Sequence, residues 1–173
     1  MFGNLGLNLS VVSYGDIDNY KDGELIGTIS PSDFLFTGGE PTLFKGFTGL
    51  VEFFRGSVKP YRFSLFTNGW WGLEGDFTID SRNFNDFTEF MDFLTGAGFY
   101  RLILSIDGLG DDHDVIRGEK GLFQRNMNII RYAKEKGVTV EVQSILNKRN
   151  INYIQEFLDY LKEYGVKMIS LGV

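Results

Sequence analysis

The sequence predicts an α/β fold in which a parallel sheet is covered by amphipathic helices. Short apolar segments with strand character alternate along the chain with segments whose apolar residues recur at helical spacing. Gly98, Gly137 and Gly165 end helical segments immediately before strands. With 173 residues, 43% of them hydrophobic, the chain is long enough for one domain with a sizeable core. Buried strands separated by helices favour parallel pairing through right-handed crossovers.

Six strands and four helices account for the predicted sheet and its cover. The strands are expected at residues 7–14, 34–37, 62–67, 100–106, 138–145 and 167–171. The helices are expected at residues 42–55, 83–95, 122–136 and 151–164. The acidic segment 15–33 is predicted to be a solvated loop. Residues 68–82 and 108–118 are predicted to be loops as well.

Composition excludes several classes of function. The formal net charge of −6 argues against general binding of nucleic acid or of an anionic membrane, which needs a basic face. No apolar run approaches the ~20 residues of a membrane span, and the N-terminus lacks the basic region of a signal peptide. The sequence therefore predicts a cytoplasmic protein without nucleic-acid or membrane partners.

Metal chemistry is restricted by the residues that are missing. The chain has no cysteine, and its one histidine is His113. Thiolates are therefore absent as ligands for zinc, copper or an iron–sulfur cluster, and no His/Cys metal site can be assembled from one chain. No metal ligand is predicted.

Unusual polar residues follow the predicted strands. They are Gly38-Gly39-Glu40, Thr67-Asn68-Gly69, Ser105 with Asp107-Gly108, and Gln143 with Asn147. The carboxyl ends of parallel strands meet at one edge of a sheet, so these groups are expected to form a binding site there. For the first group a simpler interpretation stays open. It is a tight strand-to-helix turn, in which Glu40 favours the N-terminus of the following helix.

Four motifs in order give a more specific indication. They are Phe36–Leu43 (FTGGEPTL), Thr67-Asn68-Gly69, Ser105-Ile106-Asp107-Gly108 and the segment 113–118 (HDVIRG). Together they resemble the radical SAM superfamily, from residue 33 to the C-terminus. The resemblance implies a partial (β/α)₆ barrel in which residues 1–173 form a single domain. Residues 1–32 would be its atypical N-terminal strand and acidic loop.

The resemblance also implies an S-adenosylmethionine pocket. The residues implied to bind this cofactor are Gly38, Gly39, Glu40, Thr67, Asn68, Ser105, Asp107 and Arg117. The Gly-Gly-Glu segment would bind the amino group of the cofactor, since a carboxylate and backbone acceptors suit an ammonium. Ser105 and Asp107 would contact its ribose and methionine.

Some of these roles have open alternatives. Arg117 would meet the methionine carboxylate or pair with Asp112 or Asp114, and both readings stay open. Thr67 and Asn68 would line the pocket or simply form a turn. His113 is expected to have a structural hydrogen-bonding role.

The sequence departs from the family at its defining feature. The family holds a [4Fe–4S] cluster with a Cys-x₃-Cys-x₂-Cys motif, whereas here Gly3, Leu7 and Ser10 have that spacing. The cluster is therefore not supportable by this chain, and no radical catalysis is expected from it alone. No catalytic residue is predicted, and whether the chain is an enzyme stays open.

Three hypotheses follow for function. The first is a degenerate, cluster-less domain, a pseudoenzyme that keeps a small-molecule pocket. The second is an enzyme component: either its cluster comes from another chain of a radical SAM enzyme, or a variant active site does non-radical chemistry on S-adenosylmethionine. The third is an interaction module that pairs with a protein partner or a second copy through open barrel edges. Trp70 and Trp71 would serve it as an exposed anchor, or would instead pack over the barrel mouth.

Overall fold

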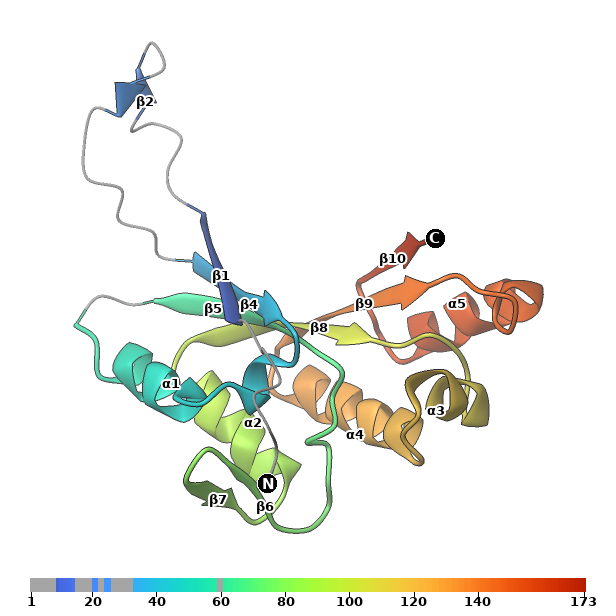
Figure 1. Ribbon diagram of the computed structural model, residues 1–173, viewed down its shortest axis with the longest axis horizontal. Helices are drawn as coiled ribbons and strands as arrows, with labels where there is room; N and C mark the ends of the chain where they lie inside the picture. Colours follow the sequence, from blue (N-terminus) through green and yellow to red (C-terminus); the bar gives the residue numbers. More distant parts are fainter. Residues whose placement is uncertain (1–8, 15–19, 22–23, 26–32, 59–60) are drawn as a thin grey trace.

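A six-stranded sheet organises the computed structural model (Figure 1). The structure describes residues 9–14, 20–21, 24–25, 33–58 and 61–173. The strand order is β1-β4-β5-β8-β9-β10. In that order the strands are Leu9–Tyr14, Asp33–Gly38, Arg62–Thr67, Phe99–Ser105, Thr139–Ile145 and Met168–Gly172. All neighbouring pairs from β4 to β10 are parallel, which confirms the predicted α/β class.

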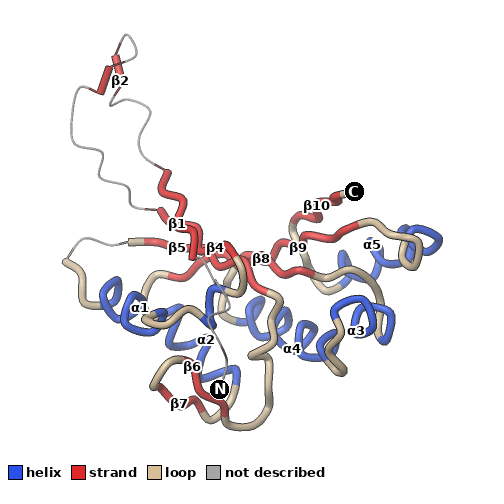
Figure 2. Tube along the Cα trace, in the orientation of Figure 1, coloured by secondary structure: helices blue, strands red, loops and turns tan. Residues whose placement is uncertain are grey.

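Helices connect the parallel strands. They are α1 (Phe47–Arg55), α2 (Phe87–Thr95), α3 (Asp111–Arg117), α4 (Leu122–Glu135) and α5 (Ile154–Glu163). Two 3₁₀ turns, η2 (Pro41–Leu43) and η3 (Ile151–Tyr153), precede α1 and α5. Helices α1, α2 and α4 lie along one face of the sheet, as Figures 1 and 2 show. None of the helices in the described part of the chain is long and apolar enough to cross a membrane.

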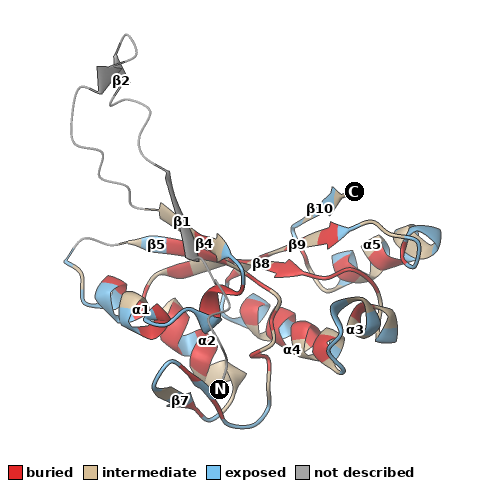
Figure 3. Cartoon of the chain, viewed as in Figure 1, coloured by how far each residue is buried: buried red, intermediate tan, exposed pale blue. Residues whose placement is uncertain are grey.

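The core lies between the sheet and these helices, where Figure 3 shows most of the buried residues. It is strongly aromatic, in keeping with the 17 phenylalanines of the sequence. The ring of Phe36 stacks on Phe54 and Phe63, with centroids 5.6 and 5.0 Å apart. Trp71 is fully buried and meets the ring of Phe90 edge-on at 4.9 Å. The hypothesis that Trp71 is an exposed anchor is therefore wrong, because the side chain belongs to the core.

The first strand differs from the prediction in direction. β1 pairs antiparallel with β4, from Leu9 opposite Gly38 to Tyr14 opposite Asp33. The strand was correctly located, but it is an antiparallel edge rather than a member of the parallel set. Its partly alternating apolar and polar residues are typical of such an edge, because a strand buried on both faces reads as a continuous apolar run.

Three predicted segments are also corrected. The single helix expected at 42–55 is divided into η2 and α1, because Gly46 between them adopts a left-handed φ of 102°. The helix expected from residue 83 begins at Phe87, after a hairpin of β6 (Phe77–Ile79) and β7 (Arg82–Phe84). Asp86 caps this helix by accepting from the backbone N–H groups of Thr88 and Glu89.

The third of these corrections concerns the loop predicted at 108–118, which contains α3. Acidic residues in the first turn of α3 and Arg117 in its last turn both suit the helix dipole, and this signal was missed. The acidic loop predicted at 15–33 includes a two-residue pairing of β2 (Tyr20–Lys21) with β3 (Glu24–Leu25). Its last residue, Asp33, begins β4, and the rest of that loop lies outside the described residues, as do Gly3 and Leu7.

Candidate functional site

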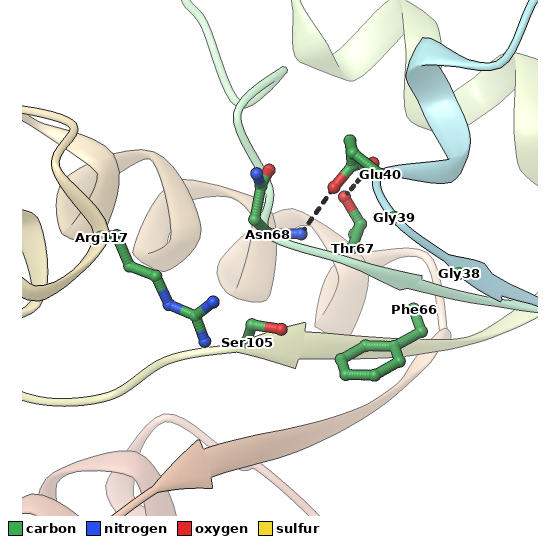
Figure 4. A pocket seen from close by; sticks show the side chains of 8 residues that line it. All are labelled: Gly38, Gly39, Glu40, Phe66, Thr67, Asn68, Ser105 and Arg117. Atoms are coloured by element: carbon green, nitrogen blue, oxygen red, sulfur yellow. Dashed lines mark hydrogen bonds between the residues drawn. The ribbon is translucent and has the colours of Figure 1, made fainter. Parts of the chain in front are cut away.

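A cavity of about 260 Å³ opens at the carboxyl ends of β4, β5 and β8. It is lined by Gly38, Gly39, Glu40, Phe66, Thr67, Asn68, Ser105 and Arg117 (Figure 4). Seven of these eight residues were named from the sequence. Phe66 was missed, although its place directly before Thr67-Asn68 at the carboxyl end of β5 could have indicated it.

Glu40 holds the ends of β4 and β5 together. Its Oε1 accepts hydrogen bonds from the hydroxyls of Thr42 (2.7 Å) and Thr67 (2.8 Å), and from the Thr42 N–H (3.3 Å). Its Oε2 accepts from the Asn68 N–H at 2.8 Å. The side chain caps η2 as well as lining the cavity, so the turn interpretation and the site interpretation describe the same residue.

Two tryptophan side chains orient the threonine hydroxyls that donate to the Glu40 carboxylate. The Trp70 indole N–H donates to the hydroxyl of Thr42 at 2.8 Å, and the Trp71 indole N–H donates to the hydroxyl of Thr67 at 3.2 Å. Each threonine hydroxyl is thereby fixed as a donor toward Glu40. The indole N–H groups of Trp70 and Trp71 thus help to hold the hydrogen bonds of Glu40 at the carboxyl edge of the sheet.

Burial raises the pKa of Glu40 above its usual value, and the hydrogen bonds from Asn68, Thr42 and Thr67 oppose that shift. Oε1 already has three donors, whereas Oε2 has one. A carboxylate oxygen has two lone pairs, so Oε2 keeps acceptor capacity for a cationic group in the cavity.

Arg117 approaches the cavity from α3, opposite Glu40. Figure 4 shows its guanidinium near Ser105, with Asn68 between Arg117 and Glu40. Its Nε lies 2.7 Å from Oδ2 of Asp107. The predicted ion pair of Arg117 with Asp112 or Asp114 is therefore wrong. Asp112 faces Arg149 at 3.9 Å, and Asp114 accepts from the N–H groups of Gly121 and Phe123.

Asp107 is the predicted cofactor residue that does not line the cavity. It is 3% exposed and lies just beyond the end of β8, beside Arg117. His113, with no exposed surface, accepts from the Asp107 N–H at Nδ1 (3.0 Å), in keeping with the structural role expected of it. Asn150, also fully buried, donates to the backbone oxygens of Asp107 (2.7 Å) and Ile145 (2.8 Å) and so joins β8 to β9. Nothing in the sequence pattern singled out Asn150.

The fold and this cavity define a class of protein: an α/β domain with a cavity lined by charged and polar residues at the carboxyl edge of a parallel sheet. The sequence matches the family model of the Radical SAM superfamily over residues 24–161. This match spans well over half of the chain, so the chain belongs to the Radical SAM superfamily.

Curated relatives agree with this assignment. The chain is 30% identical over 141 residues to the sporulation killing factor maturation protein SkfB of Bacillus subtilis (strain 168), covering 82% of this chain. It is 30% identical over 135 residues to an Fe-coproporphyrin III synthase of Methanosarcina barkeri, covering 78% of this chain. In both cases the match spans 30% of the relative's own length.

The solved structures show the same fold. The radical S-adenosylmethionine methyltransferase TsrM from Kitasatospora setae, with cobalamin and a [4Fe–4S] cluster bound, superposes with a TM-score of 0.60 at 15% identity. The superposition covers 83% of this chain and 28% of TsrM. At this identity the likeness supports the partial barrel fold alone.

The two groups that the family implies differ in how they fit this chain. A [4Fe–4S] cluster does not fit, because there is no cysteine among the 173 residues. The described residues also contain no group of three or more His, Asp or Glu side chains that could hold a metal ion. The amino-acid end of S-adenosylmethionine does fit the chemistry of the cavity, which offers a carboxylate on one side and a guanidinium on the other.

Proposed function

We propose that this chain is a cluster-less radical SAM domain that binds S-adenosylmethionine by its methionine end. The observation that carries the proposal is the presence of opposite charges on two sides of the cavity, Glu40 after the end of β4 and Arg117 on α3. An α-amino acid presents an ammonium and a carboxylate on one carbon. A site with one fixed charge of each sign therefore recognises this end of the ligand.

In this proposal, different residues of the cavity bind different groups of the ligand. Oε2 of Glu40, with the backbone oxygens of the Gly38-Gly39 segment, takes the ammonium. The guanidinium of Arg117 takes the carboxylate, and Ser105 and Asn68 supply polar contacts between the two charges. In the family, the cluster supplies the electron that cleaves S-adenosylmethionine. Because this chain cannot ligate the cluster, the proposal assigns it no catalytic residue and describes it as a pseudoenzyme.

Isothermal titration calorimetry with S-adenosylmethionine tests the proposal. Micromolar binding is expected for the wild type, and Arg117→Gln should weaken it at least about tenfold because a charged hydrogen bond is lost. Lys120→Gln, an exposed cation three residues away, is the matched control and should bind like the wild type. If the wild type gives no heat of binding at millimolar S-adenosylmethionine, the proposal is wrong.

A second candidate function is an interaction domain. In the described chain, β10 is one of the two edge strands of the sheet, and Met168 and Leu171 on it are 50% and 44% exposed. Such an edge can pair with another strand. Light scattering behind size-exclusion chromatography should show a dimer under this reading and a monomer under the first one.

The remaining hypothesis is that another chain supplies the cluster. Anaerobic reconstitution of the purified chain with iron and sulfide tests its premise. A stoichiometric iron–sulfur absorbance on the isolated chain would contradict the conclusion drawn from the missing cysteines.

A further inference from the structure

Asp107 is engaged on every side by the protein itself. Its Oδ2 lies 2.7 Å from Arg117 Nε, and its Oδ1 accepts from the Ile145 N–H at 2.8 Å. Its own N–H donates to His113, and its carbonyl oxygen accepts from Asn150. These contacts connect the end of β8 with the end of β9, with α3 and with the turn before η3. A side chain so occupied and 3% exposed is not available to a ligand.

The contact with Asp107 decides which edge of the Arg117 guanidinium is presented to the cavity. A guanidinium binds a carboxylate side-on through Nε and one terminal nitrogen, or end-on through its two terminal nitrogens. Because Asp107 occupies Nε, the end-on edge remains. Figure 4 shows the terminal nitrogens of Arg117 turned toward Ser105, which also lines the cavity.

We propose that Asp107 is a positioning residue, which orients Arg117 so that the cavity selects ligands carrying a carboxylate. The inference rests on the proposed function and adds a determinant of specificity to it. It replaces the direct ligand contact predicted for Asp107 from the sequence.

The variant Asp107→Asn separates the charge of the side chain from its shape. The two oxygens of Asp107 have different partners: Oδ1 accepts from the Ile145 N–H, and Oδ2 lies 2.7 Å from Nε of the Arg117 guanidinium. An asparagine has one side-chain acceptor and no charge, so its NH₂ group would face one of these partners and release it. Asp111→Asn is the matched control, because it makes the same change of charge at an exposed position in the first turn of α3.

The experiment titrates wild type and both variants with S-adenosylmethionine and with its decarboxylated analogue. These two ligands differ only in the carboxylate that Arg117 is proposed to hold. In Asp107→Asn, the affinity for S-adenosylmethionine should fall about tenfold, while that for the decarboxylated analogue stays within about twofold. Asp111→Asn should change neither affinity. In the Arg117→Gln background, adding Asp107→Asn should cause no further selective loss, because the two residues act as a unit.

The outcomes separate the two proposals. Binding of S-adenosylmethionine by the wild type, with an equal loss of both ligands or no loss in Asp107→Asn, overturns this inference and leaves the proposed function standing. No binding of either ligand by the wild type overturns both. If Asp107→Asn does not fold, Arg117→Lys takes its place, because lysine keeps the ion pair with Asp107 but has no end-on fork. The same selective loss in Arg117→Lys supports the proposal, and unchanged ratios overturn it.

Discussion

Mild acid should destabilise the fold through His113, the one histidine of the chain. The ring has no exposed surface, and its Nδ1 accepts from the Asp107 N–H at 3.0 Å, so the proton of the neutral ring lies on Nε2. Nε2 in turn lies 3.3 Å from Nδ2 of Asn126. Because both atoms are donors in this tautomer, the Nε2–H proton has an acceptor only when the amide is turned so that its unpaired Oδ1 faces the ring. Protonation would place a second N–H against the Asp107 N–H and a charge in the core. Burial, with the nearby charge of Arg117, accordingly lowers the pKa of His113 from 6.5 to about 4.

The size and sign of the effect follow from this pKa. Between pH 6.5 and pH 4 the unfolded chain binds a proton at this position and the folded chain does not, so stability falls as the pH falls. The contribution is fully present above pH 6.5, and a gap from 6.5 to about 4 corresponds to roughly 3 kcal/mol of unfolding free energy. Over the accessible range from pH 6.5 to pH 5 the loss should be about 2 kcal/mol.

Two measurements check this prediction. The Cε1 proton of a single histidine is followed without ambiguity by NMR, and its titration midpoint in the folded protein should lie well below 6.5. Urea unfolding at pH 7 and pH 5 should show a smaller acid loss in His113→Asn, by about 2 kcal/mol, because asparagine offers the Asp107 N–H an acceptor that does not titrate. A midpoint near 6.5, or equal acid losses in the two proteins, would refute the reasoning.

Two further predictions concern carboxylates that hold chain segments together. Glu40→Gln should lower the unfolding free energy by about 2 kcal/mol in urea titrations, because an amide cannot accept on both sides and its NH₂ group meets a buried donor. Glu135→Gln, at an exposed position, should stay within about 0.5 kcal/mol, and a similar small change for Glu40→Gln would count against the assigned bonds. Asp80→Ala should cost about 1–2 kcal/mol, since Asp80 accepts from the N–H groups of Gly46 and Thr48 at the start of α1 and has a left-handed φ of 54°. Asp80→Asn keeps an acceptor and tolerates that φ, so its melting temperature should lie between those of wild type and Asp80→Ala; equal losses in the two variants would contradict the capping role.

The sequence was sufficient for those parts of the fold and cavity that depend on local pattern. Strand β8 and helix α4 have clear periodicity, and the polar groups after β4, β5 and β8 converge because parallel strands end at one edge. Strand β1 was located by the same means. Its antiparallel direction was not predicted, because direction depends on which strand it pairs with and not on its own residues.

Contacts between distant residues could not be predicted from the pattern. The sequence pattern offers Arg117 the acids of its own segment as partners, whereas in the structure its partner is Asp107, ten positions earlier, which lies just beyond the end of β8. Asp80 capping α1 across 32 residues, and Asn150 reaching Asp107 across 43, are of the same kind. Each satisfies a buried or terminal backbone group that a local motif leaves open.

The residues of the cavity are also residues of the fold, and this bears on what their presence means. Glu40 satisfies two backbone N–H groups and two hydroxyls, and Asp107 satisfies one backbone N–H and one guanidinium. None of these partners belongs to a segment that would carry cluster ligands. Within the described residues, losing three cysteines from the cluster segment would therefore leave the carboxylates of Glu40 and Asp107 paired, and the fold would still be destabilised by losing Glu40 or Asp107. The stability of the fold is by itself a sufficient reason for these motifs to be present. The motifs therefore do not distinguish a working pocket from a scaffold. The ratio of the affinities for S-adenosylmethionine and its decarboxylated analogue does.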